Sequence, residues 1–588
     1  MNLETLALIG NCQVSALVAD TGEVVWCCLP RFDSEPVFGR LLDPRAGTFR
    51  VSAVGGGRGR SRYLPNTNVL ETVFTSSEGV FRVVDFFPRF EQHSRMFRPA
   101  QLFRIIEPVS GTPRIEVRCE PTLGWSRQPP VALTGSNHVS YEGFGAELRL
   151  TTDLPLSLLD GRPIALTQRQ VLALTWGAPI EEPLLPLADR FWASTERYWV
   201  QWVKHCEIPP AYQAEVIRSA LALKLHVFED TGAIIAAMTT SVPEALDDSE
   251  RTWDYRYCWL RDAAYALDAF RLLGHFRERE AFVHFLLNLS SAAPNLALQP
   301  LYRVDGRAEL TERVVPGWAG YQGHGPVRDG NGAALHLQHD IYGEVVLALA
   351  PIFLDDRFSS DRSYETARMV EALAQRGADL AGTPDAGIWE YRTEWVPQSF
   401  STLMCWAGAD RGARALAQVN AGASDRLLKE AERLHRMLLD QCYSAELGCF
   451  VGTHGGHTFD ASMLQAVRLR ALPAGDLRLL SSVERLSREL NLNGWTRRYR
   501  HDDGFGEPTV AFLMCTFWRV EALALLGRLA EARSLLDTVR KVASPLGLFS
   551  EDVETETGRL CGNFPQAYSH VGMIHAAFAT SPRWSEVL

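Results

Sequence analysis

The sequence predicts a multidomain protein in which an N-terminal antiparallel β-sandwich, a linker helix and a C-terminal toroid of paired helices follow one another. The 588 residues exceed the usual size of one hydrophobic core. β-forming segments fill the chain as far as about Pro186, and helical patterns follow. We expect the sandwich at 1–185, the linker helix at 186–209 and the helical domain at 210–588.

Strand patterns occupy the first of these regions. Residues that favour strands alternate or cluster between turns rich in Gly, Pro, Asn and Asp. The strand segments are VLETVFTSSEGVFRVVDFF, QLFRIIEPVS, RIEVRCEP, HVSYEGFGAELRLTTD and RQVLALTW. Such strands favour two sheets packed as a sandwich. The Gly/Arg-rich stretch at 55–62 has an anion site as its functional interpretation, but a solvated turn is favoured and we assign it no role.

Helical patterns continue from there to the C-terminus. The first, at residues 187–206, can place Phe191, Tyr198, Trp199 and Trp202 on one face, so we expect a linker packed on both domains. About twelve further helices are expected. They begin near Ala211, Asp262, Arg279, His339, Arg362, Ser401, Asp425, Asp460, Leu477, Thr509, Leu529 and Pro565.

Helices in this number fit a toroid in which inner and outer helices alternate. No short repeat recurs cleanly enough to favour a solenoid. In a toroid the loops at one end form the pocket. The chemically unusual segments all fall between helices: WDYRYCWLRD, RVVPGWAGYQGHGPVRDGNG, GIWEYR, RRYRHDDGFGE and LFSEDVE.

The composition limits the class of partner. A net charge of -11 and a pI near 5.8 argue against nucleic acid and anionic membranes, and favour a neutral small-molecule or oligosaccharide substrate. No apolar run approaches the length that spans a bilayer, and the N-terminus lacks the features of a secretory leader. The 11 cysteines are scattered, without CxxC pairs. We expect a cytoplasmic protein with reduced thiols, and a homo-oligomer is compatible with the sequence.

The run RTWDYRYCWLRD, from Arg251 to Asp262, interleaves aromatic rings with arginines and aspartates. This mixture is typical of a sugar pocket, because aromatic rings pack against the C–H face of a pyranose while Arg261 and Asp262 can orient its hydroxyls. The alternative is a buried ion-pair network supported by aromatic rings. The run alone leaves both interpretations open.

Two carboxylates in distant loops are candidates for proton transfer. Glu390 lies between Trp389 and Tyr391, an aromatic setting that excludes solvent and suits a general acid; the alternative is an ordinary carboxylate paired with Arg392. Glu551 opens the acidic loop SEDVETE, where local reasoning favours a surface charge or a helix N-terminal residue. Two such groups are the minimal set for glycoside hydrolysis, and their separation, which sequence does not supply, decides between inversion and retention.

Other polar residues have simpler interpretations. His454 and His457 have metal-like spacing, but a turn or a structural hydrogen bond is favoured. Asp329 and Asn331 stand in a calcium-like RDGNG run that lacks the remaining ligands. Hydrolysis by two carboxylates requires neither a metal nor an organic cofactor, and none is expected. Residues with two equally plausible uses, at the barrel end or in hydrogen bonds between helices, are Gln338, Asp340 and Tyr342, while His570 is expected to brace the Glu551 loop.

The ordered motifs WDYRYCWLRDA, YRVDG, GYQGHGPVRDGNGAA, GIWEYR, FWRVEALALLGR, GLFSED and GNFPQAYSH resemble the bacterial and archaeal branch of glycoside hydrolase family 15, which contains glucoamylases and trehalases. The N-terminal IGNCQVSALVADTGEVVWCCLPRFDSEPVFGRLLD is similar to the leading β-domain of the trehalase-type members. The resemblance spans nearly the whole chain. It implies a β-sandwich followed by an (α/α)6 barrel.

The resemblance also implies roles for individual residues. Glu390 matches the general acid and Glu551 the general base of an inverting mechanism. Tyr255 matches a tyrosine that helps to hold the attacking water. The other matches are to residues around the nonreducing glucose: Trp259, Arg261, Asp262 and Trp389, with Arg498 and Tyr568 as weaker matches that close the same subsite.

One segment departs from the family pattern. Many members have approximately HFTHSK where this chain has PQSFST at Pro397 to Thr402, so two histidines and a lysine are replaced. These positions follow the acid and bear on the leaving-group side. The leading hypothesis is an inverting exo-acting α-glucosidase that releases β-glucose, with α,α-trehalose as substrate. The alternatives are a glucoamylase or isomaltose-type glucohydrolase acting on α-1,4 or α-1,6 links, and a noncatalytic sugar-binding regulatory module.

Overall fold

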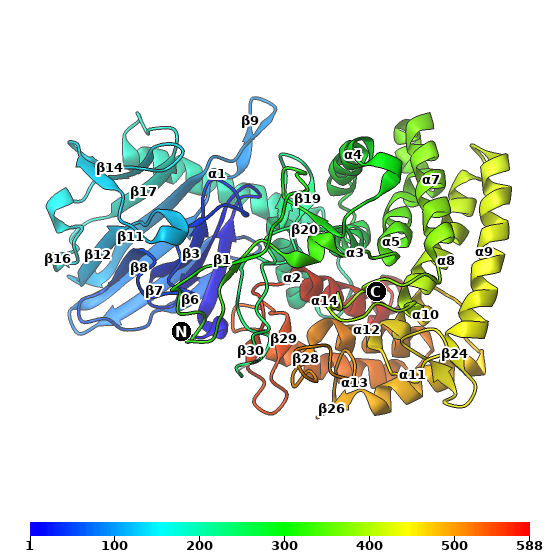
Figure 1. Ribbon diagram of the computed structural model, residues 1–588. Coiled ribbons are helices and arrows are strands. Elements are labelled where there is room, and N and C mark those ends of the chain that lie inside the picture. The colour runs from blue at the N-terminus through cyan, green and yellow to red at the C-terminus, as the bar shows by residue number, and fades with distance from the viewer. Residues whose placement is uncertain (248) are drawn as a thin grey trace.

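The computed structural model describes residues 1–247 and 249–588. An N-terminal β-rich part and a C-terminal helical part lie side by side, with the β-rich part in blue and cyan in Figure 1. The order of these parts along the chain is as predicted. No helix among the described residues has both the length and the apolar character needed to cross a bilayer.

Two large antiparallel sheets form most of the β-rich part, and β9 (Phe90–Gln92) pairs with β10 (Arg95–Phe97) as a separate hairpin. The seven-stranded sheet contains β1 (Leu6–Gly10), β2 (Ser15–Ala19), β3 (Glu23–Cys28), β4 (Pro36–Phe38), β5 (Thr48–Ala53), β12 (Arg114–Glu120) and β16 (Ile164–Ala165). The eight-stranded sheet contains β6 (Arg60–Tyr63), β7 (Leu70–Ser76), β8 (Gly79–Phe86), β11 (Gln101–Gly111), β13 (Val131–Thr134), β14 (His138–Glu142), β15 (Leu148–Thr152) and β17 (Gln170–Trp176). The predicted turn at 55–62 was wrong at its end, because residues 60–62 pair with β7 as part of β6.

Successive side chains of a strand point to opposite faces of its sheet, and each face packs in a different hydrophobic cluster. Phe49 and Val51 of the seven-stranded sheet meet Phe81 and Val83 of the eight-stranded sheet in one hydrophobic cluster between the sheets. Val84, one residue further on, points to the opposite face and joins a separate cluster. Both faces of the eight-stranded sheet are therefore packed.

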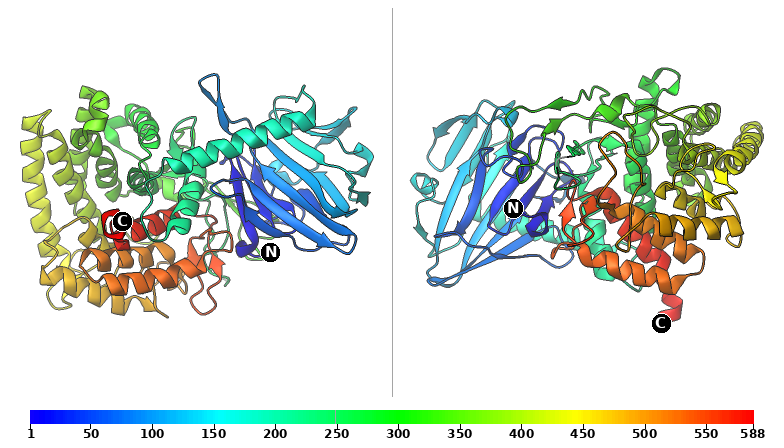
Figure 2. Two further views of the ribbon diagram at one scale, coloured as in Figure 1. Left: turned by 180° about the vertical axis from the view of Figure 1, so that it is seen from behind. Right: turned by 60° about the horizontal axis from the view of Figure 1, so that its bottom comes forward.

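Helix α1 (Leu184–Lys204) covers that second face and runs on to the helical part (Figure 2). Leu187 and Phe191 in its first half pack against the eight-stranded sheet. Trp199 and Trp202 in its second half lie in the core of the helical part. One amphipathic helix thus contacts both parts of the chain.

The seven-stranded sheet is also buried on both faces, which explains why its first three strands are almost continuously apolar. Leu8, Leu17 and Trp26 pack on the face turned toward the helices. The Trp26 indole N–H donates to the Met238 carbonyl at 2.9 Å. The β-rich and helical parts consequently share one continuous core.

A helix begins within four residues of each predicted start except the one near Asp460. The Asp460 side chain accepts the Ser462 N–H at 2.8 Å, and this tight turn leads into a 3₁₀ segment and a short helix in place of a long one. The helices are α2 (Gln213–Leu225), α3 (Leu260–Leu272), α4 (Arg277–Ala292), α5 (Asp340–Leu349), α6 (Pro351–Leu354), α7 (Tyr364–Leu380), α8 (Ser399–Leu416), α9 (Ala421–Gln441), α10 (Gln465–Arg468), α11 (Leu477–Glu489), α12 (Leu513–Leu525), α13 (Leu529–Val539), α14 (Ala567–Thr580) and α15 (Trp584–Val587).

Neighbouring helices pack in a regular succession. Helix α3 contacts α5 and α14, α5 contacts α8, and α12 contacts α14. The α5–α8 crossing is close: a Cβ on Gly343 would lie 2.0 Å from the Met404 carbonyl oxygen. Only glycine permits that approach, so the backbones of α5 and α8 are in direct contact at this crossing.

Candidate active site

All nine residues predicted for the site line one pocket in the helical part. They come from segments that are far apart in the chain, and Ala236, Ile388, Phe512, Trp518 and Gln566 complete the wall. The nine are Tyr255, Trp259, Arg261, Asp262, Trp389, Glu390, Arg498, Glu551 and Tyr568. A larger cavity, of about 590 Å³, is lined by Asp268 and Arg468 and contains none of the nine.

The segment 251–262 touches both candidate carboxylates. The Tyr255 hydroxyl donates to Glu551 Oε1 at 2.9 Å, and the Trp259 indole N–H donates to Glu390 Oε1 at 2.6 Å. The two aromatic rings meet edge to face with centroids 5.3 Å apart. One short segment therefore donates a hydrogen bond to each of the two carboxylates and fixes their relative positions.

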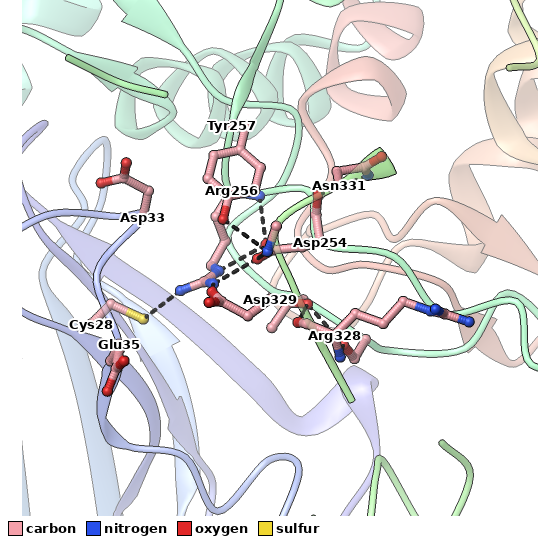
Figure 3. A network of polar contacts seen from close by, with 12 residues as sticks. Cys28, Asp33, Glu35, Asp254, Arg256, Tyr257, Arg328, Asp329 and Asn331 are labelled. Carbon is pink, nitrogen blue, oxygen red and sulfur yellow. Dashed lines mark hydrogen bonds and ion pairs between the residues drawn. The ribbon is translucent and has the colours of Figure 1, made fainter. Parts of the chain in front are cut away.

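Both interpretations of this segment apply, each to different residues. Tyr255 and Trp259 face the pocket, while Asp254 and Arg256 form a fully buried ion pair at 2.6 Å (Figure 3). The Asp254 backbone bridges Thr240, and the side chains of Asp254 and Arg256 do not line the pocket that Tyr255 and Trp259 line. The sugar-pocket prediction and the ion-pair alternative thus describe different residues of one segment.

Arg261 and Asp262 follow at the start of α3. Arg261 donates to the Ile388 carbonyl at 3.0 Å and to Gln338 at 3.3 Å, and its guanidinium lies 3.4 Å from Glu390. It also pairs with Asp262 at 3.2 Å. Burial, with a smaller contribution from Glu390, raises the pKa of Asp262 to about 6, although Arg261 opposes the shift. These contacts hold a guanidinium and a carboxyl group at the pocket wall.

Glu390 sits on a strained turn. Its φ of 62° lies in the left-handed region, which is uncommon for a residue with a side chain and costs about 1–3 kcal/mol. The turn is closed by hydrogen bonds from Glu390 N–H to the Gly387 carbonyl and from Tyr391 N–H to the Ala386 carbonyl. Strain of this kind is retained where the direction of a side chain matters.

The alternative partner for Glu390 was wrong. Arg392 forms two hydrogen bonds with Glu312, at 2.7 and 3.0 Å, and leaves Glu390 to Trp259 and Arg261. Beside the carboxyl, the Trp389 indole N–H donates to Asp460 at 2.9 Å, which fixes that ring in the wall. Glu390 is therefore oriented by Trp259 and Arg261, and not by the sequence neighbours Trp389 and Tyr391 that the prediction named.

Glu551 is buried, with 2% of its surface exposed, so its interpretation as a surface charge was wrong. In addition to the Tyr255 hydroxyl, it accepts the Asn563 N–H at 3.3 Å on Oε2. Gly562 has a φ of +74°, and a Cβ there would lie 2.6 Å from the Glu551 Cβ. Glycine is therefore required where the backbone passes the carboxylate.

Arg498 lies among three carboxylates. Its NH2 group is 2.9 Å from Glu244, 3.2 Å from Asp552 and 3.8 Å from Glu551. Burial first, and then the charges of Asp552 and Glu244, raise the pKa of Glu551 well above its ordinary value, against the lowering effects of Arg498 and Tyr255. Burial with the charge of Glu244 likewise raises the pKa of Asp552 to about 7. These groups titrate together.

Sequence reasoning missed Glu244 and Asp552. Asp552 directly follows Glu551, so its adjacency was a usable signal. Glu244 carries no local signal in SVPEALDD and reaches Arg498 only through the fold. The Tyr568 hydroxyl, by contrast, is buried without a hydrogen-bond partner among the described residues, which leaves it available to a ligand.

The histidine and calcium-like motifs have structural contacts. His454 lies 2.7 Å from the Thr402 hydroxyl, and Asn331 caps the Ala333 N–H at 2.9 Å. Asp329 pairs with Arg313 at 2.9 Å. In the part of the chain that the structure describes, no group of three or more His, Cys, Asp or Glu side chains could hold a metal ion.

Gln338, Asp340 and Tyr342 were expected either to line the barrel end or to form hydrogen bonds between helices, and the structure shows both uses. Gln338 reaches the site through Arg261, while the Tyr342 hydroxyl donates to the Leu296 carbonyl at 3.0 Å. Asp340 is fully buried, and burial raises its pKa to about 6. His570 lies 3.4 Å from the Phe549 N–H and so braces the segment before Glu551.

The segment that departs from the family pattern forms the buried start of α8. Ser399 and Ser401 are buried, and the Ser401 hydroxyl donates to Asp385 at 2.7 Å. The pocket that contains the nine residues is lined from other segments. The residues at 397–402 therefore do not line that pocket, and Ser401 contacts the segment that leads into the Glu390 turn.

Family models match both parts of the chain. The family model "Glycosyl hydrolases family 15" matches residues 210–578, and "Trehalase-like, N-terminal" matches residues 1–140. The chain is 33% identical to a trehalase of Mycolicibacterium smegmatis, over 97% of this chain and 89% of that protein. It is 31% identical to a trehalase of Thermoplasma volcanium, over 99% of this chain and 93% of that protein.

Among solved structures, a bacterial glucoamylase complexed with acarbose has a similar fold. Its TM-score is 0.69 at 14% identity, over 98% of this chain and 94% of that one. At this identity the likeness concerns the fold, which extends over both the β-rich and the helical parts.

Proposed function

The chain belongs to the glycosyl hydrolases family 15, and from that premise we propose that it is an inverting, exo-acting hydrolase of α,α-trehalose. The resemblance seen in the sequence motifs is confirmed, and the protein is a glycoside hydrolase. Trehalase-named relatives that match nearly the full chain support trehalose as the substrate. The trehalase-like match at residues 1–140 supports the same choice.

The proposed mechanism uses the two carboxylates as an acid and a base. Glu390 protonates the glycosidic oxygen, and Glu551 takes a proton from the attacking water, which Tyr255 helps to hold. The observation that carries the proposal is that Tyr255 and Trp259, four residues apart in one segment, donate hydrogen bonds to Glu551 and Glu390 in a single pocket. Such anchoring preorganises both proton transfers.

The same pocket offers groups for one terminal glucose. Arg261 and Asp262 supply donors and acceptors for hydroxyls, and the unpartnered Tyr568 hydroxyl adds another. Trp259 and Trp389 supply apolar surface for the sugar ring. We assign these residues, with Arg498, to the nonreducing glucose.

A second pocket adjoins the first and suits the leaving sugar. The two pockets share Tyr255, Trp389, Glu390 and Arg498, so the proposed acid lines both. The second pocket is walled by a buried ion pair in which Arg251 contacts Asp503 at 2.6 and 2.9 Å. An acceptor side walled by this buried ion pair favours a disaccharide over a polymer.

A substrate panel tests the proposal. We expect glucose release from α,α-trehalose and much slower release from maltose, isomaltose and soluble starch, measured with an enzyme-coupled glucose assay. Hydrolysis of maltose or isomaltose without hydrolysis of trehalose would favour the glucoamylase or isomaltose-type alternative. Binding of trehalose without turnover of any of these glucosides would favour the regulatory module.

Asp552→Asn is expected to extend activity toward acid. Glu551 must be ionised to act as a base, so activity falls as the pH drops through its raised pKa. Removal of the negative charge at Asp552 lowers the pKa of Glu551, and the acidic limb of the kcat/KM profile should move to lower pH. Glu556→Gln, an exposed change in the same loop, is the control. An acidic limb that stays in place or moves to higher pH would contradict this electrostatic account.

Several finer features belong to the same proposal. We assign 1–185 to a β-sandwich, 186–209 to a linker helix and 210–588 to an (α/α)6 barrel. The contacts run from α12 through α14, α3 and α5 to α8, and the 3₁₀ segment Ala461–Leu464 contacts both α8 and α12, which supports a closed inner ring. The scattered cysteines and acidic pI support a cytoplasmic enzyme acting on a small glucoside.

A further inference from the structure

Arg256 connects the segment behind the pocket to the β-rich part. Its Nε donates to Asp254 at 2.9 Å, and its NH2 donates to Asp254 at 2.6 Å and to Asp329 at 3.1 Å. Its NH1 donates to the Ser34 carbonyl at 2.6 Å. The same NH1 donates to Cys28 Sγ at 3.6 Å (Figure 3). All five guanidinium N–H groups thus have acceptors, two of them in the β-rich part.

The acceptors of Arg256 are themselves held in place. Asp254 also accepts the Gly330 N–H at 3.2 Å, and its carbonyl accepts the Asn331 amide at 3.2 Å. Asp329 is paired on its other oxygen with Arg313. The backbone on both sides of Tyr255 is therefore fixed from the face opposite the pocket.

The contributing turn of the β-rich part is anchored at further points. Arg31 pairs with Asp305 at 2.6 Å, and Arg303 pairs with Asp33 at 3.1 Å. Ser34, whose carbonyl receives Arg256, lies between these contacts and Glu35, which faces Arg313 at 3.6 Å. Ion pairs with the helical part therefore hold the turn at residues 31–35 in place.

We propose that Arg256 is a positioning residue through which the β-rich part holds Tyr255 against Glu551. The buried guanidinium ties together Asp254 and Arg256, the two residues that flank Tyr255, and so holds the Tyr255 hydroxyl against Glu551, 2.9 Å away. This inference rests on the proposed role of Glu551 as the base. It makes the β-rich part a component of the catalytic apparatus.

A double-mutant cycle tests the inference. Arg256→Lys replaces a planar five-donor group with a single ammonium, which is unable to reach all the acceptors. We expect kcat for trehalose to fall by up to about 10²-fold with KM little changed, because a small displacement of Tyr255 misplaces the water. In a Tyr255→Phe background the same change should alter kcat by no more than about twofold. Single effects that multiply in the double variant would overturn the inference.

Arg104→Lys is the matched control. Arg104 is also fully buried, pairs with Asp85 at 2.7 Å and donates to the carbonyls of Phe49 and Gly22, all within the β-rich part. We expect a lower Tm and an unchanged kcat. A loss of kcat equal to that of Arg256→Lys would mean that any weakening of the β-rich part impairs catalysis, and would overturn a specific role for Arg256.

A second variant keeps the test decisive if Arg256→Lys does not fold. Asp329→Asn weakens one acceptor and leaves the segment 251–262 unaltered; it should lower kcat less, with the same lack of additivity toward Tyr255→Phe. The role of Glu551 and the role of Arg256 are refuted by different results. If the Glu551→Gln enzyme is active, Glu551 is not the base. If that enzyme is inactive but the effects of Arg256→Lys and Tyr255→Phe on kcat are additive, only the positioning role of Arg256 is wrong.

Discussion

Replacement of Glu551 by Gln is expected to lower kcat for trehalose by about 10²–10⁴-fold or more. The amide keeps the size of the side chain and can still accept the Tyr255 hydrogen bond, but it is unable to take a proton from water. Affinity for glucose should survive, because Arg261 and Asp262, the groups assigned to its hydroxyls, are unchanged. Glucose release and calorimetric binding of glucose measure the two effects separately.

Two further measurements sharpen this result. Azide attacks carbon without a general base, so azide added to the Glu551→Gln enzyme should restore turnover and yield β-glucosyl azide. Glu554→Gln, an exposed change three residues away, should retain full activity. Wild-type kcat in the Glu551→Gln enzyme would remove this residue from the mechanism.

Replacement of Glu390 by Gln is expected to cost a similar factor, about 10²–10⁴-fold in kcat, on trehalose. The loss should depend on the leaving group, because the residue supplies a proton to the departing oxygen. An α-glucosyl fluoride, whose fluoride departs without protonation, should be hydrolysed at a rate much closer to that of the wild-type enzyme. This selectivity distinguishes a general acid from a residue that only shapes the pocket.

Glu394→Gln is the control for that comparison, since Glu394 is exposed in the same loop. It should leave both substrates unaffected. If Glu390→Gln slowed the fluoride and trehalose equally, the acid role would be wrong, and the strained turn at φ 62° would need another explanation.

Most of the secondary structure could be predicted from the local pattern of apolar and polar residues. Strand alternation from Val69 to Trp176 and helical spacing after Ala211 correspond to the observed elements, because each burial pattern has the period of its own secondary structure. The failure near Asp460 has a local cause, the side-chain hydrogen bond that favours a tight turn. At residues 60–62, pairing with β7 overrode a turn-like composition.

The site was predictable from family motifs but not from local reasoning alone. Glu551 stands in an acidic loop that looks solvated, and its burial depends on Tyr255, Asn563 and Gly562, which lie elsewhere or later in the chain. The carboxylate cluster around Arg498 is likewise a product of the fold. Within RTWDYRYCWLRD, composition did not reveal which residues face the pocket and which bind the β-rich part.

The most direct test of the account is proton NMR of trehalose hydrolysis in its first minutes, before mutarotation mixes the anomers. Inversion changes the configuration of the attacked ring only, because the bond from the anomeric carbon of the leaving ring to the bridging oxygen is not broken. Inversion therefore gives equal initial amounts of β-glucose, from the attacked ring, and α-glucose, from the leaving ring. Initial release of α-glucose alone would demonstrate retention and contradict a mechanism in which Glu551 activates water.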